Sequence, residues 1–321
     1  ALHLLHRPYI AGSPGMESGM IMTLMPVLLG MFLAPILPGL VNRTKAVLAG
    51  RNGPPLLQLW FDIMKLLQKG AVYSRTATWV VRAGPIVGLA ALLVALDLLP
   101  FGSQSALLSF NGDLIVFAYL LGLARFFTVI AAMDTGSAFE GMGSSREVFF
   151  SMLAEPGLIL SLAALCRHSS AMSLSALYPL HDFTQLLAAP HIFALVAAAL
   201  FIVFLAENAR VPVDDPNTHL ELTMIHEVMV LDHGGPDFAF ILYGAALKFW
   251  ILGSLLTGLL LPFRTGSAVA DLLMAVLAQC GLAIAVGVVE SMMARIRLLR
   301  VTQFLVASSV FAAIALGLLL R

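Results

Sequence analysis

Charged residues are scarce in this chain: Asp, Glu, Lys and Arg make up 11% of its 321 residues, whereas hydrophobic residues make up 60%. A soluble domain carries roughly 25% charged residues, and the mean hydropathy here is +0.95. This composition excludes a water-soluble enzyme and indicates a protein surrounded mostly by lipid. Lys and Arg number 18 and Asp and Glu number 18, so no net charge is present to attract nucleic acid or an acidic partner.

Cysteine is equally scarce. Cys166 and Cys280 are the two in the sequence, and both lie in apolar surroundings typical of small buried side chains. An iron–sulfur cluster is held by four cysteine thiolates, which two cysteines cannot supply. His219, His226 and His233 are seven residues apart, which is not the i, i+4 spacing that places two metal ligands on one helical face. We therefore expect the chain to bind no metal or other cofactor of its own.

Long hydrophobic runs are plentiful. Eight stretches approach the roughly 20 apolar residues that a transmembrane helix needs; they run from Gly19 to Val41, Ala83 to Leu99, Asp113 to Met133, Val148 to Cys166, Pro190 to Ala206, Phe238 to Leu261, Ala268 to Val289 and Val301 to Leu320. Such runs are too long for the strands of a membrane barrel. The predicted fold class is all-α: a polytopic membrane protein of about eight transmembrane helices.

The N-terminal residues 1–18 are interpreted as a leader. They contain Pro and Gly but lack the basic start and the cleavage site of a signal peptide. The first hydrophobic stretch is therefore predicted to be a retained helix. Residues 19–321 are predicted to form a single transmembrane helical domain.

The basic residues predict the orientation of these helices. Loops on one side hold twelve Lys and Arg residues and loops on the other side hold four. Because positive residues favour the cytoplasmic side, the loops 42–82, 134–147, 207–237 and 290–300 are predicted to be cytoplasmic, with both termini outside. We expect a functional partner on the cytoplasmic side to face these loops.

The first of these loops contains an amphipathic segment. After Pro54 and Pro55, the run LLQLWFDIMKLLQK places polar residues at spacings of four, three and four: Gln58, Asp62, Lys65 and Lys69. One polar stripe on an apolar cylinder predicts a helix that lies in the membrane interface. A re-entrant or short core helix is the alternative, and a surface that grips another subunit is compatible with the first interpretation.

The loop 207–237 is unusually acidic. Seven carboxylates surround the single Arg210: Glu207, Asp214, Asp215, Glu221, Glu227, Asp232 and Asp237. Their mutual repulsion favours proton uptake by some of them near neutral pH, and histidine titrates in the same range. The alternative is a solvated loop whose acids dock a basic partner.

Ionisable residues also lie within the predicted helices or at their ends. They are Arg125, Glu155, Glu207, Lys248 and Glu290. Each is costly in lipid unless it faces a neighbour or water, so each is a candidate for a proton path. The alternative is an internal salt bridge that only fixes packing, for instance between Arg125 or Lys248 and Glu155.

Three motifs then carry a resemblance to a known family. The runs AENARVPVDDPNTHLEL, RNGPPLLQLWFDIMKLLQKG and GSSREVFFSMLAEPGL are similar to the membrane subunit, called subunit 1, that respiratory complex I shares with energy-converting NiFe hydrogenases. ARFFTVIAAMDTGSAFEGMGSSRE, ALKFW and ESMMARIRLL resemble the hydrogenase branch, which includes the formate hydrogenlyase and hydrogenase-4 membrane subunits. The resemblance covers the chain from the first predicted helix onward and leaves out residues 1–18.

This resemblance implies a subunit that lies between a peripheral redox arm and antiporter-like membrane subunits. It implies docking of hydrogenase-like large and small subunits, with the NiFe centre and iron–sulfur clusters, or a quinone, in the partners or at the interface. It also implies a bacterial or archaeal cytoplasmic membrane. The residues expected to couple redox change to proton or sodium movement are Glu155, Glu207, Asp214, Asp215, Glu221, Glu227, Glu290, Lys248 and Arg125. Those expected to dock subunits are Arg51, Gly53, Gln58, Asp62, Lys65, Arg146, Arg210, Arg295 and Arg297.

The sequence departs from the family pattern in the acidic loop. Asn217 and His219 stand where the family often has glutamates, and TMIHEVMVLDHGG differs from the usual end of the loop. Glu227, or the titratable His219 and His226, are candidates to replace the missing acids.

Two alternatives to a hydrogenase-type subunit stay open: a subunit of an NADH-quinone oxidoreductase that forms part of a quinone chamber, and a stand-alone ion-coupled transporter. A transporter is disfavoured because the chain has no repeated halves. A purely structural anchor would keep the loops and tolerate loss of the buried acids.

Overall fold

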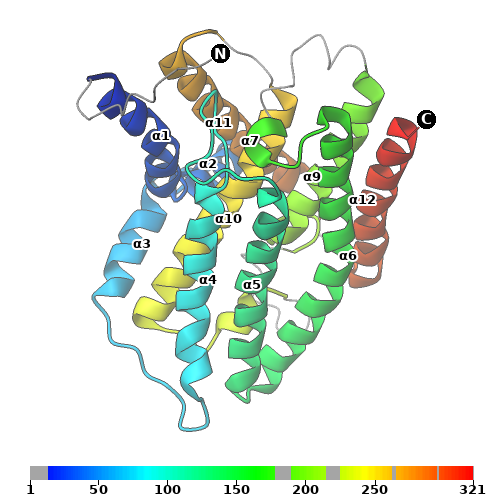
Figure 1. Ribbon diagram of the computed structural model, residues 1–321. Coiled ribbons are helices and arrows are strands. Elements are labelled where there is room, and N and C mark those ends of the chain that lie inside the picture. Colours follow the sequence, from blue (N-terminus) through cyan, green and yellow to red (C-terminus); the bar gives the residue numbers. More distant parts are fainter. Residues whose placement is uncertain (1–13, 178–188, 215–224, 262–264, 295, 321) are drawn as a thin grey trace, which may run out of the picture.

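The computed structural model is a bundle of long helices that run side by side (Figure 1). It describes residues 14–177, 189–214, 225–261, 265–294 and 296–320. Within these ranges, seven helices are long and apolar enough to cross a membrane, and a bent helix pair makes up to eight. The predicted polytopic all-α fold is confirmed.

The bent pair is the first predicted span. Instead of one helix from Gly19 to Val41, the chain forms α1 (Pro14–Leu33) and α2 (Ile36–Leu48), whose axes differ by 47°. Pro35 lies between them. Because proline has no N–H and its ring clashes with the preceding turn, it breaks a helix at this point. The predicted span therefore consists of two helices with a bend between them, and together they remain one candidate membrane span.

The predicted interfacial helix is present as α3 (Gln58–Leu67). It is shorter than the amphipathic run, and Lys69 lies beyond its end. Gln58 Nε2 donates to Asp62 Oδ1 at 3.0 Å along the polar stripe. Ile63 is buried, and α3 packs against α10 (Gly235–Leu260).

The longest helix, α6, differs most from the prediction. It spans Ala138–Ser169, so most of the predicted loop 134–147 is helical. The short helix η1 (Glu227–Val230) packs against this added part, where Gly143 permits a close approach: a Cβ there would lie 2.3 Å from Val228 Cγ1. Polar residues in the segment, among them Glu140, are buried by this contact. Hydropathy alone does not predict this extension of α6, because its polar composition is typical of a solvated loop.

The remaining spans begin and end within about four residues of the predictions. They are α4 (Trp79–Asp97), α5 (Asp113–Asp134), α9 (Pro190–Glu207), α10, α11 (Ala268–Met292) and α12 (Leu298–Leu319). α10 is central and contacts α4, α3, α11 and α9, whereas α12 packs in contact with both α6 and α9. α5 lies between α4 and α6 (Figure 1). These contacts bring the ionisable residues of α5, α6, α9 and α10 together.

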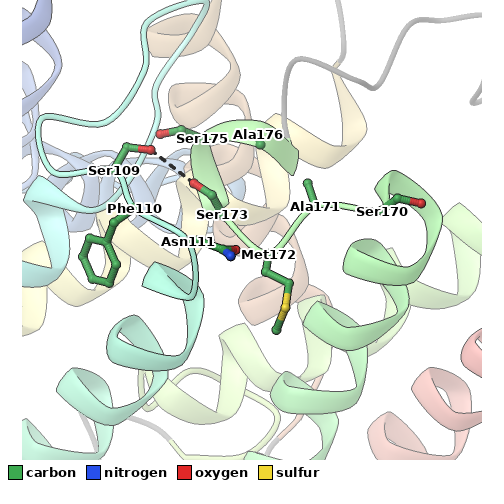
Figure 2. A pocket seen from close by; sticks show the side chains of 9 residues that line it. All are labelled: Ser109, Phe110, Asn111, Ser170, Ala171, Met172, Ser173, Ser175 and Ala176. Carbon is green, nitrogen blue, oxygen red and sulfur yellow. Dashed lines mark hydrogen bonds between the residues drawn. The ribbon is translucent and has the colours of Figure 1, made fainter.

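A hollow of about 700 Å³ lies near the N-terminal end of α5, beside α7 (Leu174–Leu177). Figure 2 shows that hydroxyl and apolar side chains line it, and Ser109 Oγ lies 3.2 Å from Ser173 Oγ. Buried Asp113 anchors this region by accepting hydrogen bonds from Ser173 Oγ and the Leu174 N–H. Arg125 is twelve residues further along α5, about 18 Å away at 1.5 Å per residue, so this hollow is separate from the ionic groups described next.

Candidate functional site

Arg125, in the middle of α5, is the centre of a group of buried charges. Its Nη1 lies 2.5 Å from Glu155 Oε1 and its Nε lies 3.5 Å from Glu147 Oε1. Its Nη2 contacts Glu207, the last residue of α9. The planar guanidinium carries donors in several directions, so one side chain joins three helices.

Lys248 of α10 joins the same group. Its Nζ lies 2.6 Å from Glu207 Oε2, so Glu207 is held between two cations. The Glu207 side chain is 6% exposed and that of Arg125 is 10% exposed, whereas 49% of the Glu155 side chain is exposed. Glu207 is thus a buried bridge between helices, and Glu155 is the carboxylate that reaches the outer surface of the bundle.

His226 connects this group to the acidic loop. Its Nε2 lies 3.1 Å from Glu147 Oε2 and its Nδ1 lies 3.4 Å from Asp214 Oδ2. Asp214 also accepts hydrogen bonds from the backbone N–H groups of Ile225 and His226. Burial disfavours the charged imidazole, but the carboxylates of Glu147 and Asp214 outweigh this effect and raise the pKa of His226 above its ordinary value.

These residues form a continuous chain of ionisable groups, which we call the Arg125 cluster: Asp214, His226, Glu147, Arg125, Glu155, Glu207 and Lys248. Among the described residues, the cluster has four carboxylates and two permanent cations, which leaves two negative charges in excess when all four carboxylates are ionised and His226 is neutral. A buried excess of this kind favours proton uptake. The ion pairs among the described residues therefore do not balance the carboxylates of the cluster one for one.

A second group of charges has the opposite balance. Glu290 of α11 lies 2.9 Å from Lys45 Nζ and 3.4 Å from Arg210 Nη1, and its side chain is fully buried. The Arg210 guanidinium also lies 5.2 Å from the centre of the Phe249 ring. We call this group the Glu290 cluster. One carboxylate between two cations has no excess negative charge.

The structure thus divides the predicted coupling residues. Arg125, Glu155, Glu207, Asp214 and Lys248 come together, whereas Glu290 lies in the other cluster. Glu227 begins η1 and is partly buried. Asp215 and Glu221 lie outside the described residues.

The predicted docking residues lie in different environments. Arg51, Lys65 and Arg297 are exposed, Gly53 and Arg146 are partly buried, and Arg295 lies outside the described residues. Gln58 and Asp62 bond to each other on α3. Arg210 is buried beside Glu290, which places it among the internal charges and not on the surface. Their docking roles stay predictions.

The sequence reasoning missed Glu147. Its predicted loop position placed it outside the membrane, but the extended α6 carries it into the cluster. The signal was the spacing of four in Glu147, Ser151 and Glu155, which puts three polar groups on one side of a helix; Ser151 Oγ donates to Glu147 Oε1 at 3.2 Å. Glu140, which is fully buried and accepts from the Asp232 N–H at 2.9 Å, was also missed.

Across the described ranges, no three His, Cys, Asp or Glu side chains come together as a set of metal ligands. Cys166 and Cys280 are free thiols.

Comparison with known proteins relates this architecture to a family. The family model described as NADH dehydrogenase matches residues 20–320. Formate hydrogenlyase subunit 4 of Escherichia coli is 30% identical over 273 residues, which is 83% of this chain and 87% of the relative. Hydrogenase-4 component C of the same organism is 31% identical over 73% of this chain and 72% of the relative. A subunit of the NADH-quinone oxidoreductase of Neisseria meningitidis is 27% identical over 64% of this chain and 58% of the relative.

A solved structure supports the fold. The membrane-bound sulfane sulfur reductase, an archaeal respiratory membrane complex, contains a chain that matches with a TM-score of 0.78 and 21% identity, over 94% of this chain and 99% of that chain. The seven to eight candidate membrane spans within the described residues identify a multi-pass membrane protein. The chain therefore belongs to the NADH dehydrogenase family, among the membrane proteins that resemble subunit 1 of complex I.

Proposed function

We propose that this chain is the membrane subunit of a complex I-like oxidoreductase, in which it docks the peripheral redox arm and couples its reaction to proton or sodium translocation. The observation that carries the proposal is the Arg125 cluster, a connected series of ionisable groups with more acids than bases. It runs from the acidic loop, at Asp214, to a carboxylate on the outer surface of the bundle, at Glu155. A structural anchor would need neither the excess of acid nor the connection.

The mechanism that we propose is electrostatic. Electron arrival, or a charged product near the acidic loop, changes the potential at Asp214 and His226. A unit charge about 4 Å away at an effective dielectric constant near 20 is worth roughly 4 kcal/mol, or about three pKa units. A proton gained or lost at His226 changes the field at Glu147, which shares Arg125 with Glu155 and Glu207. The effect thus reaches Glu155 through contacts present in the fold.

The partners that we propose are hydrogenase-like large and small subunits and antiporter-like membrane subunits. The NiFe centre and iron–sulfur clusters, or a quinone, would belong to those partners or to the interface. The two E. coli relatives are named as components of formate hydrogenlyase and hydrogenase-4, which supports the hydrogenase type.

We place the acidic loop and the loop that carries α3 on the cytoplasmic side, as the basic residues predict. Mass spectrometry of the detergent-purified assembly tests the composition: a NiFe large subunit supports the hydrogenase type, and its absence favours quinone chemistry.

The sharpest test of coupling is Glu155→Gln. Glu155 is half exposed, so loss of its charge leaves Glu147 and Glu207 to balance Arg125, and the assembly should survive. Glu207→Gln is less suitable because it would leave Arg125 and Lys248 buried with less compensation, and a buried ion pair without one partner costs about 3–5 kcal/mol. We expect assembled Glu155→Gln complexes to transfer electrons and lose ion translocation, measured in membrane vesicles with the redox substrates of the complex.

Glu290→Gln is the matched control, because it makes the same change in the cluster without excess acid. We expect Glu290→Gln complexes that assemble to retain ion translocation per electron. Assembled Glu155→Gln complexes that translocate ions at the unmodified ratio would refute the proposal.

A further inference from the structure

A stripe of exposed side chains follows the outer surface of α6. Val148, Met152, Glu155 and Ile159 are separated by four, three and four residues, which places them on one face of the helix. The three apolar members are 52%, 62% and 55% exposed, and the Glu155 side chain is 49% exposed. One carboxyl group therefore lies in an otherwise apolar outer face.

The hydropathy of α6 predicts that this carboxyl group lies inside the membrane. Glu155 follows Val148, the first residue of the apolar run, by seven positions, or about 10 Å along the helix. Within the described part of the chain, its one polar partner is Arg125, which bonds Oε1. No other described residue donates to the remaining lone pairs of the carboxyl group, and hydrocarbon cannot supply a donor.

A second acceptor lies one turn away. Pro156 has no N–H, so the carbonyl of Met152 lacks the helical donor that normally comes from the fourth residue onward. Met152 belongs to the same exposed stripe as Glu155. The missing N–H of Pro156 thus leaves a second acceptor close to the exposed carboxyl group, and the group complementary to both is a hydrogen-bond donor.

The surroundings do not suit bulk water. The neighbouring helix α5 also exposes large apolar residues along one side, including Leu123 and Phe126, and Phe126 follows Arg125 directly. α5 and α6 lie side by side in the bundle (Figure 1). An apolar surface with a single desolvated polar centre is typical of a helix interface in the membrane, where polar side chains bond across helices.

We propose that this α5–α6 face docks a transmembrane helix of a different subunit, and that the helix presents an N–H or O–H donor side chain to Glu155 and the Met152 carbonyl. A second copy of this chain is a poor fit. Rotation about the membrane normal preserves depth, so the same face of a second copy would bring its own Glu155 to this level, and two acceptors would oppose each other. The inference does not depend on ion translocation, since a purely structural anchor would also need its exposed carboxyl group covered.

Photo-crosslinking in the native membrane tests the proposal. A photoreactive amino acid replaces Met152 in the complete complex, and a matched sample carries it at Leu277, which is 63% exposed on α11, a helix that packs on α2 and α10 away from this face. We expect Met152 to give one adduct with a co-purifying chain, and Leu277 not to give that adduct. Peptide mapping should place the crosslink in a transmembrane helix with a donor side chain within one turn. Adducts with lipid alone, with a second copy of this chain or with a wholly apolar helix would overturn the inference.

A double-mutant cycle adds a readout that does not depend on the photochemistry. We expect Glu155→Leu, or replacement of the mapped donor by Leu, to lower recovery of the partner about tenfold, because each leaves a buried polar group unpaired. The two changes together should restore part of this loss; strictly additive losses would contradict the contact. If docking fails these tests while Glu155→Gln still abolishes ion translocation, coupling stands without this interface. If docking passes and Glu155→Gln translocates normally, the interface stands and coupling fails.

Discussion

The two ionic clusters use the same residue types and differ in charge balance. In the Glu290 cluster, one buried carboxylate lies between Lys45 and Arg210. In the Arg125 cluster, four carboxylates share two cations and a histidine. In the first arrangement two cations more than compensate one carboxylate, and the triad joins α2 and the loop after α9 to α11. In the second, the carboxylates outnumber the cations among the described residues, so its charge depends on protons or on a neighbouring group.

The comparison shows that a buried acid in a membrane helix is not by itself a functional signal. Glu290 is more buried than Glu155, yet it is the better compensated. The informative property is the balance of charge within a contact network. Membrane burial makes any imbalance costly, which is why its presence in the Arg125 cluster points to function.

The largest effect in this comparison is expected from Arg125→Met. The change leaves Glu147, Glu155 and Glu207 close together without their shared cation. Breaking a buried ion pair by removing one partner costs about 3–5 kcal/mol, so we expect a marked fall in the melting temperature of the purified assembly. Glu290→Gln should lower it less, because Lys45 is 26% exposed and can be hydrated, which leaves Arg210, beside the Phe249 ring, as the one buried cation that loses its carboxylate. Equal losses in the two variants would contradict the assigned charge balance.

A smaller, pH-dependent effect is expected from His226→Gln. The raised pKa of His226 means that its charged form is favoured in the folded protein. Its contribution to stability is fully present below the unfolded pKa of about 6.5 and is lost as pH rises through the folded value. The difference in melting temperature between the unmodified protein and the variant should therefore be largest below about pH 6.5 and shrink at higher pH. A difference that is constant with pH would show that His226 does not titrate against Glu147 and Asp214.

Most of the fold could be predicted from hydropathy, because the apolar runs are long and uninterrupted. The exceptions have local causes. Pro35 divides the first run into two helices, and the polar start of α6 is helical because η1 packs on it. Local hydropathy predicts neither the contact between α6 and η1 nor the direction of the bend between α1 and α2, because both depend on the packing of segments that are distant in the sequence.

The candidate site could be predicted in its parts and not in its connections. Arg125, Glu155, Glu207 and Lys248 stand out as charges in apolar helices, and an ion pair between Arg125 and Glu155 was one of the interpretations left open. Their convergence depends on the packing of α5, α6, α9 and α10. Glu147 was missed because the start of α6 was interpreted as a loop, although its spacing of eight from Glu155 was visible.

The central claim is that the Arg125 cluster changes its protonation when the attached redox centre changes state, and that the Glu290 cluster does not. Redox-triggered infrared difference spectroscopy of the purified assembly measures this directly, because protonated carboxyl groups absorb apart from carboxylates. We expect a carboxyl signal in the unmodified complex that is lost or shifted in Glu155→Gln and retained in Glu290→Gln. A spectrum with no carboxyl signal, or one that is unchanged in Glu155→Gln, would contradict it.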